Sequence, residues 1–126
     1  MAYPESDKQH TFRKSVGFAA AGIFWSMKER NMKIHCSMAV LVILAGFYFS
    51  LSIVEWLFVL SSIAGVIALE MMNTAVETAV DLVTEEYREL ARISKDVAAG
   101  AVLVYSLYAF VVGCIIFFPK VLSIVA

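Results

Sequence analysis

The chain has 126 residues, of which 61% are hydrophobic, 10 are Lys or Arg and 11 are Asp or Glu. A soluble chain has about 45–50% apolar residues, and a soluble domain this small buries only about two thirds of its surface. A soluble enzyme is therefore disfavoured, and the net charge of −1 gives no basic surface for nucleic acid. The length allows one domain, which we expect to cover residues 1–126.

The N-terminal part combines a polar start with an amphipathic pattern. The first ten residues are polar, and the first long apolar run starts too late for a cleavable signal peptide. Apolar side chains then recur at helical spacing, at Phe12, Val16, Ala19, Ala20, Ile23, Phe24 and Met27. We predict a helix over about residues 12–30 that lies in the membrane interface. The alternative is an ordinary buried helix packed on the rest of the protein.

Three runs of the sequence carry no formal charge: Ile34–Val54, Trp56–Leu69 and Val97–Pro119. A bilayer core about 30 Å thick needs roughly 20 helical residues. The first and third runs satisfy this length, and the second continues in the same apolar pattern to about Val83 with acids inside it. We predict an all-α integral membrane protein with spans at about residues 33–51, 55–83 and 95–118.

The basic residues are distributed asymmetrically about these spans. Nine of the ten Lys and Arg lie before the first span or between the second and the third, and only Lys120 lies elsewhere. With three spans, both regions lie on one side of the membrane. The positive-inside rule makes that side cytoplasmic. We therefore expect a cell-membrane protein with a cytoplasmic N-terminus and an external C-terminus.

The second span carries a polar stripe. At 3.6 residues per turn, Glu70, Asn73, Glu77 and Asp81 fall on one face of a helix, in a stripe about 16 Å long. A solvated helix end explains Asp81 and Glu77, but Glu70 lies about two turns deeper. Acids inside a span are costly, and they usually face the bundle interior or an aqueous cavity. We therefore expect a functional role for Glu70.

Other polar residues gather on the same side of the membrane. They are Glu29 before the first span, the loop 85–88, and Ser94-Lys95-Asp96 at the start of the third span. Helix capping by Ser94 and Asp96 and snorkelling by Lys95 would explain the last group on its own. Together, however, carboxylates suit Mg²⁺ with a nucleoside phosphate, and Lys and Arg neutralise phosphate oxygens. The pattern indicates phosphoryl transfer at the membrane interface, although the sequence has no P-loop or Gly-rich nucleotide loop.

Two motifs of this side resemble a known family. The run from Glu70 to Asp81 resembles the ExxNTAxExxxD signature of the small prokaryotic diacylglycerol kinases, and the run that begins Lys95-Asp96 resembles their downstream motif at the family spacing. The resemblance covers about residues 12–120. The run Asn31-Met-Lys-Ile-His35 and the ending Phe118-Pro119-Lys120 resemble the Gram-positive branch, the undecaprenol kinases. Gram-negative members carry Glu where His35 stands, so the resemblance assigns His35 no role.

The resemblance implies a fold and an assignment of residues. It implies a homotrimer of three-span protomers that uses ATP and Mg²⁺ at sites shared between neighbouring protomers. It implies that Glu70 is the catalytic base toward the lipid hydroxyl, that Glu29 and Glu77 hold the metal, and that Asn73 orients groups near the transferred phosphoryl. The nucleotide contacts that it implies are Lys14 (or alternatively Arg13), Glu29, Glu77, Glu86, Tyr87, Arg88, Lys95 and Asp96.

We expect a lipid kinase that transfers the γ-phosphate of ATP to undecaprenol and gives undecaprenyl phosphate. An alternative acceptor is diacylglycerol, which would give phosphatidic acid. A function of another class is a small proton-coupled transporter that titrates Glu70, but this needs polar groups in the outer half of the membrane, where the third span offers few. A third alternative is a structural subunit whose helices associate through small residues such as Ala98-Ala99-Gly100-Ala101.

Overall fold

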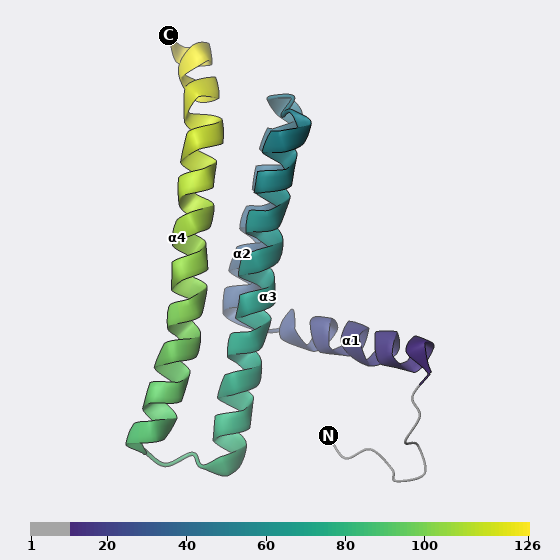
Figure 1. Cartoon of the computed structure of the whole chain (residues 1–126), viewed down its shortest axis with the longest axis vertical. Coiled ribbons are helices and arrows are strands. Elements are labelled where there is room, and N and C mark those ends of the chain that lie inside the picture. Colours follow the sequence, from purple (N-terminus) through teal and green to yellow (C-terminus); the bar gives the residue numbers. More distant parts are fainter. Residues whose placement is uncertain (1–10) are drawn as a thin grey trace.

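A computed structural model describes residues 11–126, and over this range the chain forms four helices and no strand (Figure 1). The helices are α1 (Phe12–Ser26), α2 (Arg30–Tyr48), α3 (Ile53–Val83) and α4 (Glu89–Val125). The last three are long and apolar enough to cross a membrane, by length and composition. The prediction of an all-helical fold with three helices apolar enough to span a membrane is thus confirmed, and the prediction about the first ten residues lies outside the described range.

The boundary between α1 and α2 differs from the prediction of a single helix over residues 12–30. The backbone of Met27 closes α1 by donating to the carbonyl oxygen of Ile23, and Glu29 is extended at the N-cap of α2, with φ −69° and ψ 138°. The chain therefore turns before Arg30, where α2 begins. The apolar periodicity of the sequence continues through this turn, so the periodicity could not show where the turn lies.

The start of α4 also differs from the prediction. Helix α4 begins at Glu89 rather than at residue 95, and Ser94 does not cap it but donates its hydroxyl to the carbonyl oxygen of Leu90, at 2.9 Å. Arg92 pairs with Glu89 at 2.6 Å and with Asp96 at 2.7 Å, one turn before and one turn after it. These pairs favour helical turns ahead of the apolar run.

Helix α1 runs roughly perpendicular to the other three helices and projects away from them (Figure 1). Its apolar side chains are exposed, Phe12 to 85% and Phe24 to 79%, and of α1 only Ser26 is buried. Thr11 caps its start by accepting from the backbone N–H of Lys14 at 3.4 Å. This exposure favours a helix in the membrane interface over a helix buried against the bundle.

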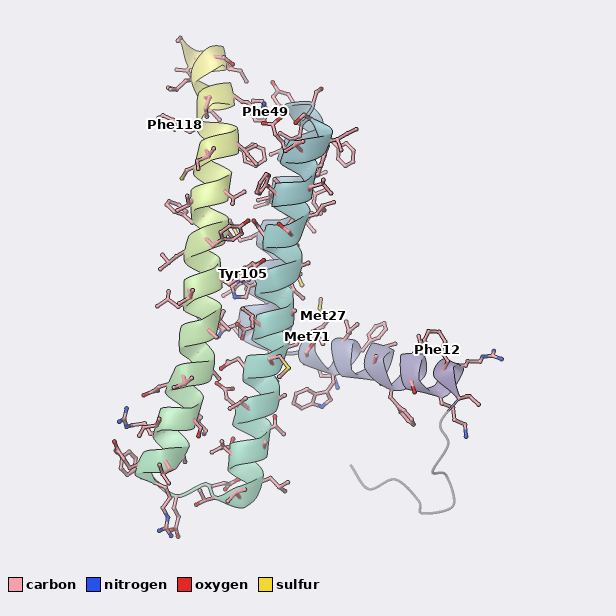
Figure 2. All side chains as sticks on the ribbon, viewed as in Figure 1. Phe12, Met27, Phe49, Met71, Tyr105 and Phe118 are labelled. Carbon is pink, nitrogen blue, oxygen red and sulfur yellow. The ribbon has the colours of Figure 1, made fainter. Side chains whose placement is uncertain are left out.

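The level of α1 divides α3 into two parts. Helices α1 and α3 are in contact, and Figure 2 shows Met27, just after α1, beside Met71 of α3. At 1.5 Å per residue, the stretch from Ile53 to Met71 is about 27 Å long, close to the roughly 30 Å of a bilayer core. The remaining stretch to Val83 extends about 18 Å beyond α1.

The ends of the helices farthest from α1 are held together by polar and apolar contacts. Ser52 and Glu55 form a reciprocal capping box at the start of α3, and Glu55 also pairs with Lys120 of α4 at 3.1 Å. The lone basic residue of this side thus has an acidic partner in the same chain. Beneath them lies an apolar cluster of Leu51, Val59, Val112 and Ile116.

Midway along the bundle, α3 and α4 approach closely at a glycine. The hydroxyl of Tyr105 on α4 donates to the carbonyl oxygen of Ser61 on α3 at 3.0 Å (Figure 2). A Cβ at Gly65 would lie 2.0–2.4 Å from the ring and hydroxyl of Tyr105. Glycine at this position therefore gives the tyrosine its place against α3.

Candidate active site

Glu70 is a buried carboxylate with a single ion-pair partner in the described part of the chain. It lies on α3 and is 3% exposed. Its Oε2 lies 3.4 Å from Nε2 of His35 on α2, whose side chain is 25% exposed. A buried carboxylate without a partner is costly, so this approach is the local compensation that the fold provides.

A polar cavity lies beside Glu70. It has a volume of about 330 Å³, and α2, α3 and α4 all contribute to its lining. The polar side chains among its lining residues are Asn31, His35, Glu70, Asn73 and Ser106. As expected for an acid within a span, Glu70 thus faces a cavity inside the bundle.

A larger, apolar cavity adjoins the polar one. It has a volume of about 590 Å³ between the same three helices and runs toward the end of the bundle that holds the apolar cluster. Most of its lining is hydrocarbon, from residues such as Ala39, Val42, Val59, Val66, Phe110 and Phe117. His35 and Ser106 line both cavities, so the two meet at these side chains.

Asn73 carries an unsatisfied oxygen next to Glu77. Its Nδ2 donates to Oε1 of Glu77 at 3.4 Å, whereas its buried Oδ1 has no partner. Buried polar atoms are rarely left unpaired in native structures. The Oδ1 atom of Asn73, about one turn beyond Glu70 on α3, is therefore available to accept a hydrogen bond or to bind a metal ion.

The two residues expected to hold metal lie on different helices. Glu29 is half-buried at the N-cap of α2 and makes no capping hydrogen bond there, and Glu77 is exposed on α3. Within residues 11–126 there is no group of three or more His, Cys, Asp or Glu side chains that could hold a metal ion. One chain thus supplies at most part of a coordination sphere.

The side chains expected to contact nucleotide lie around the connection between α3 and α4. Lys95 of α4 pairs with Asp81 of α3 at 2.7 Å, and this pair joins the two helices. Asp81 is about 16 Å along α3 from Glu70. Lys95 is therefore far from the buried carboxylate, and an extended ligand would be needed to reach both.

The neighbouring side chains of this connection pair with one another. Arg88, the N-cap of α4, lies 3.4 Å from Glu86, the hydroxyl of Tyr87 donates to Glu89 at 2.9 Å, and Asp96 accepts from Arg92. All of them are exposed, and they form a polar rim at the end of α3 and α4 (Figure 2).

Lys14 and Arg13 are not brought to this rim within one chain. Both lie in the first turn of α1, and that end of the helix points away from α2, α3 and α4 (Figures 1 and 2). If either residue contacts nucleotide at the rim, α1 of another protomer has to supply it.

Sequence reasoning missed three residues of the polar cavity: Asn31, His35 and Ser106. A signal was present for two of them, because residues four apart on a helix share a face. Asn31 and His35 are so spaced at the start of α2. Ser106 lies inside a charge-free run, and nothing in the sequence around it predicts that its hydroxyl lines a cavity with residues of α2 and α3.

Comparison with known proteins identifies the family. The family model described as prokaryotic diacylglycerol kinase matches residues 17–117, most of the chain. The chain belongs to the prokaryotic diacylglycerol kinase family. Among its relatives in this family, the undecaprenol kinase of Bacillus subtilis (strain 168) is 42% identical over 110 residues, which cover 86% of this chain and 89% of that protein.

Two further members of the family are diacylglycerol kinases. That of Synechocystis sp. is 38% identical over 112 residues, covering 87% of this chain and 64% of the relative. That of Haemophilus influenzae is 31% identical over 106 residues, covering 82% of this chain and 90% of the relative. The similarity thus extends to members of the family named for two different lipid alcohols.

Proposed function

We propose that this protein is an integral-membrane lipid kinase that transfers the γ-phosphate of ATP to undecaprenol. The observation that carries the proposal is the buried carboxylate of Glu70 in a polar cavity that adjoins an apolar one. Membership of the prokaryotic diacylglycerol kinase family implies ATP as the phosphate donor. The 42% identity to an undecaprenol kinase favours undecaprenol over diacylglycerol as the acceptor.

The two cavities suit a long-chain alcohol. The apolar cavity offers hydrocarbon contacts to the part of the chain next to the head group, and its junction with the polar cavity lies at His35, 3.4 Å from Glu70. An alcohol bound there would keep its tail among apolar residues and its hydroxyl within reach of the carboxylate. We propose that α1 lies in the membrane interface, which would set this junction at the level where lipid and nucleotide meet.

Glu70 is the group best placed to act as general base. The acceptor oxygen attacks the γ-phosphorus in line with the bond to the bridging oxygen, which breaks to release ADP. The hydroxyl proton passes to the Glu70 carboxylate as the new phosphorus–oxygen bond forms. This direct transfer needs no covalent enzyme intermediate.

The residues assigned to Mg²⁺ fit that ion in kind. Mg²⁺ prefers oxygen ligands and is usually held by one or two carboxylates together with substrate phosphates. Glu29 and Glu77 supply carboxylates, and the unpartnered Oδ1 of Asn73 lies beside Glu77. The ion would neutralise phosphate charge when bound. Asn73 would orient the phosphoryl group, because its amide is fixed by Glu77.

The polar rim suits the rest of the nucleotide. Arg88 and Lys95 offer cations for phosphate oxygens, and Glu86, Tyr87 and Asp96 offer further polar contacts. Lys14, or alternatively Arg13, would complete the site from the α1 helix of a neighbouring protomer. We propose a homotrimer with shared sites on this ground, since one chain leaves α1 remote from the rim.

The transporter hypothesis gains no support from the cavities. A proton or ion path would need polar groups on the far side of Glu70. Beyond Ser106, the apolar cavity is lined by residues such as Ala109, Phe110, Val112 and Phe117. Kinase activity is therefore the function that we propose.

The direct test is transfer of labelled phosphate from ATP by the purified protein in detergent micelles. Undecaprenol and diacylglycerol are offered side by side, with Glu70→Gln as the low-activity control. We expect labelled undecaprenyl phosphate from the wild type, less product from diacylglycerol, and about 10²–10⁴-fold slower formation of either product by the variant. Preference for diacylglycerol would change the acceptor, and the absence of any labelled lipid would refute the function.

A further inference from the structure

The imidazole of His35 occupies a place that the proposed mechanism leaves unexplained. Its Nε2 lies 3.4 Å from Oε2 of Glu70, and in the described residues this is the only ion pair of that buried carboxylate. His35 also lines both cavities, at the point where they meet. The same side chain thus touches the base, the polar cavity and the entrance to the apolar one.

The chemistry of a neutral imidazole fits this place. One ring nitrogen carries a proton and the other accepts one, and the tautomer follows from the partners. At 3.4 Å, Nε2 lies near Oε2 of Glu70, and a proton on Nε2 would hold this carboxylate oxygen once the two groups close to hydrogen-bond distance. The other polar groups that line this cavity, from all three helices, are Asn31, Asn73 and Ser106, all of them uncharged. No second charge in the cavity lining competes for the pair.

We propose that His35 is a positioning residue for the lipid kinase reaction. By holding Oε2 of Glu70, it leaves the second carboxylate oxygen to receive the proton of the acceptor hydroxyl. Its ring at the junction of the cavities also sets the depth at which the hydroxyl of a long-chain alcohol comes to rest. This role rests on the proposed function and adds to it a residue to which the family resemblance assigns nothing.

Two substitutions separate positioning from space-filling. His35→Gln keeps an N–H donor at about the reach of Nε2, whereas His35→Leu fills the space without a donor. Ser37→Ala is the matched control, because Ser37 is exposed on the same helix and donates its hydroxyl to the carbonyl oxygen of Lys33 at 2.8 Å. His35→Ala, which adds no bulk, serves beside the leucine variant in case the latter fails to fold.

We expect kcat for undecaprenol to fall about tenfold to a hundredfold in His35→Leu and His35→Ala, since a misplacement of about 1 Å can cost up to a hundredfold in rate. KM for Mg-ATP should stay within about twofold, because the groups assigned to nucleotide lie elsewhere. His35→Gln should recover most of kcat, and Ser37→Ala should match the wild type. Full activity without a donor at residue 35, or equal losses in the glutamine and leucine variants, would overturn the proposal.

A double-mutant cycle with Glu70→Gln shows whether His35 acts through the base. If it does, His35→Leu should lower the residual rate of Glu70→Gln by less than about threefold, because the group that it positions is already gone. An unchanged, full-sized loss in that background would assign His35 a separate, structural role. Kinase turnover by the wild type and by Ser37→Ala tests the proposed function, whatever the outcome of the double-mutant cycle. If neither protein phosphorylates a lipid, both the proposed function and the role of His35 are refuted.

Discussion

Burial distinguishes the acids of the polar stripe from one another. Glu70 is enclosed by three helices and faces a cavity, whereas Glu77 is exposed and Asp81 is engaged by Lys95 at 2.7 Å. An enclosed carboxylate with an open cavity beside it is suited to proton transfer. The exposed carboxylates of Glu77 and Asp81, about two and three turns away, are suited to a metal or to the partner helix. The acids of the polar stripe are therefore suited to different functions.

Replacing Glu70 should separate chemistry from scaffolding. Glu70→Gln keeps the size and hydrogen-bonding capacity of the side chain but cannot accept the proton, and loss of a general base costs about 10²–10⁴-fold in rate. The variant should still fold, because neutralising a buried acid removes a desolvation cost. We expect normal Mg-ATP binding and a loss of this size in phosphate transfer to either lipid, as followed by labelled product. Near-normal turnover would show that Glu70 is not the base.

Replacing the proposed metal ligands should change the dependence on Mg²⁺. Glu29→Gln and Glu77→Gln each remove an anionic oxygen ligand, so each should raise the Mg²⁺ concentration needed for half-maximal activity. Part of the lost rate should return at high Mg²⁺. Glu85→Gln, in the connection between α3 and α4, is the charge-matched control. Mg²⁺ titrations of turnover check this, and unchanged curves for both variants would remove them from the metal site.

At the scale of the elements, α2 and α4 each pack on α3, and all three helices line the two cavities. The contacts between α3 and α4 include the Lys95–Asp81 pair, Tyr105 against Gly65, and the apolar cluster near Ile116. The position of Tyr105 thus helps to set the distance between α3 and α4.

The glycine beside Tyr105 should be sensitive to one added methyl group. Gly65→Ala would force the ring away from α3 and break its hydrogen bond to Ser61, because the new Cβ would lie 2.0 Å from a ring carbon. Overpacking of this kind costs about 1–3 kcal/mol. We expect a lower Tm in detergent for Gly65→Ala than for Gly17→Ala in α1, where an added Cβ meets nothing within 4 Å. Equal Tm values would contradict this packing.

At the scale of the whole molecule, we propose that α1 gives the depth of the site. It projects from the bundle at about the level of Met71 (Figure 2), so a membrane that accommodates α1 in its interface would leave the rim around Lys95 in water. Glu70, the adjacent residue to Met71, is then at the boundary. A water-soluble nucleotide and a membrane-bound alcohol can meet only at such a level.

Sidedness can be tested by chemical labelling of single cysteines. In a parent with Cys36 and Cys114 replaced, a cysteine at Ser52 should react with a membrane-impermeant thiol reagent added to intact cells. A cysteine at Glu85 should react only after the membrane is opened, because the positive-inside rule puts the α3–α4 connection in the cytoplasm. Labelling of both from the same face would refute the three-span topology.

The sequence by itself determined the helical class, the three spans and the polar stripe. Each of these depends on local periodicity and on the cost of putting charge in hydrocarbon, which are properties of a segment. The position of Glu70 on the face that carries Asn73 is likewise a matter of helical spacing. The helix starts at Arg30 and Glu89 were less well predicted. A turn decides the first start and ion pairs favour the second, and a hydropathy pattern contains no information about turns or ion pairs.

Only the tertiary structure decided which side chains meet across helices. The approach of His35 to Glu70, the junction of the two cavities at Ser106 and the closeness of Tyr105 to Gly65 all join helices far apart in the sequence. Such contacts depend on the rotation and depth at which each helix packs. Many different packings of the helices are compatible with one hydropathy profile. Only the tertiary structure therefore shows that the imidazole of His35 lies beside the buried carboxylate of Glu70.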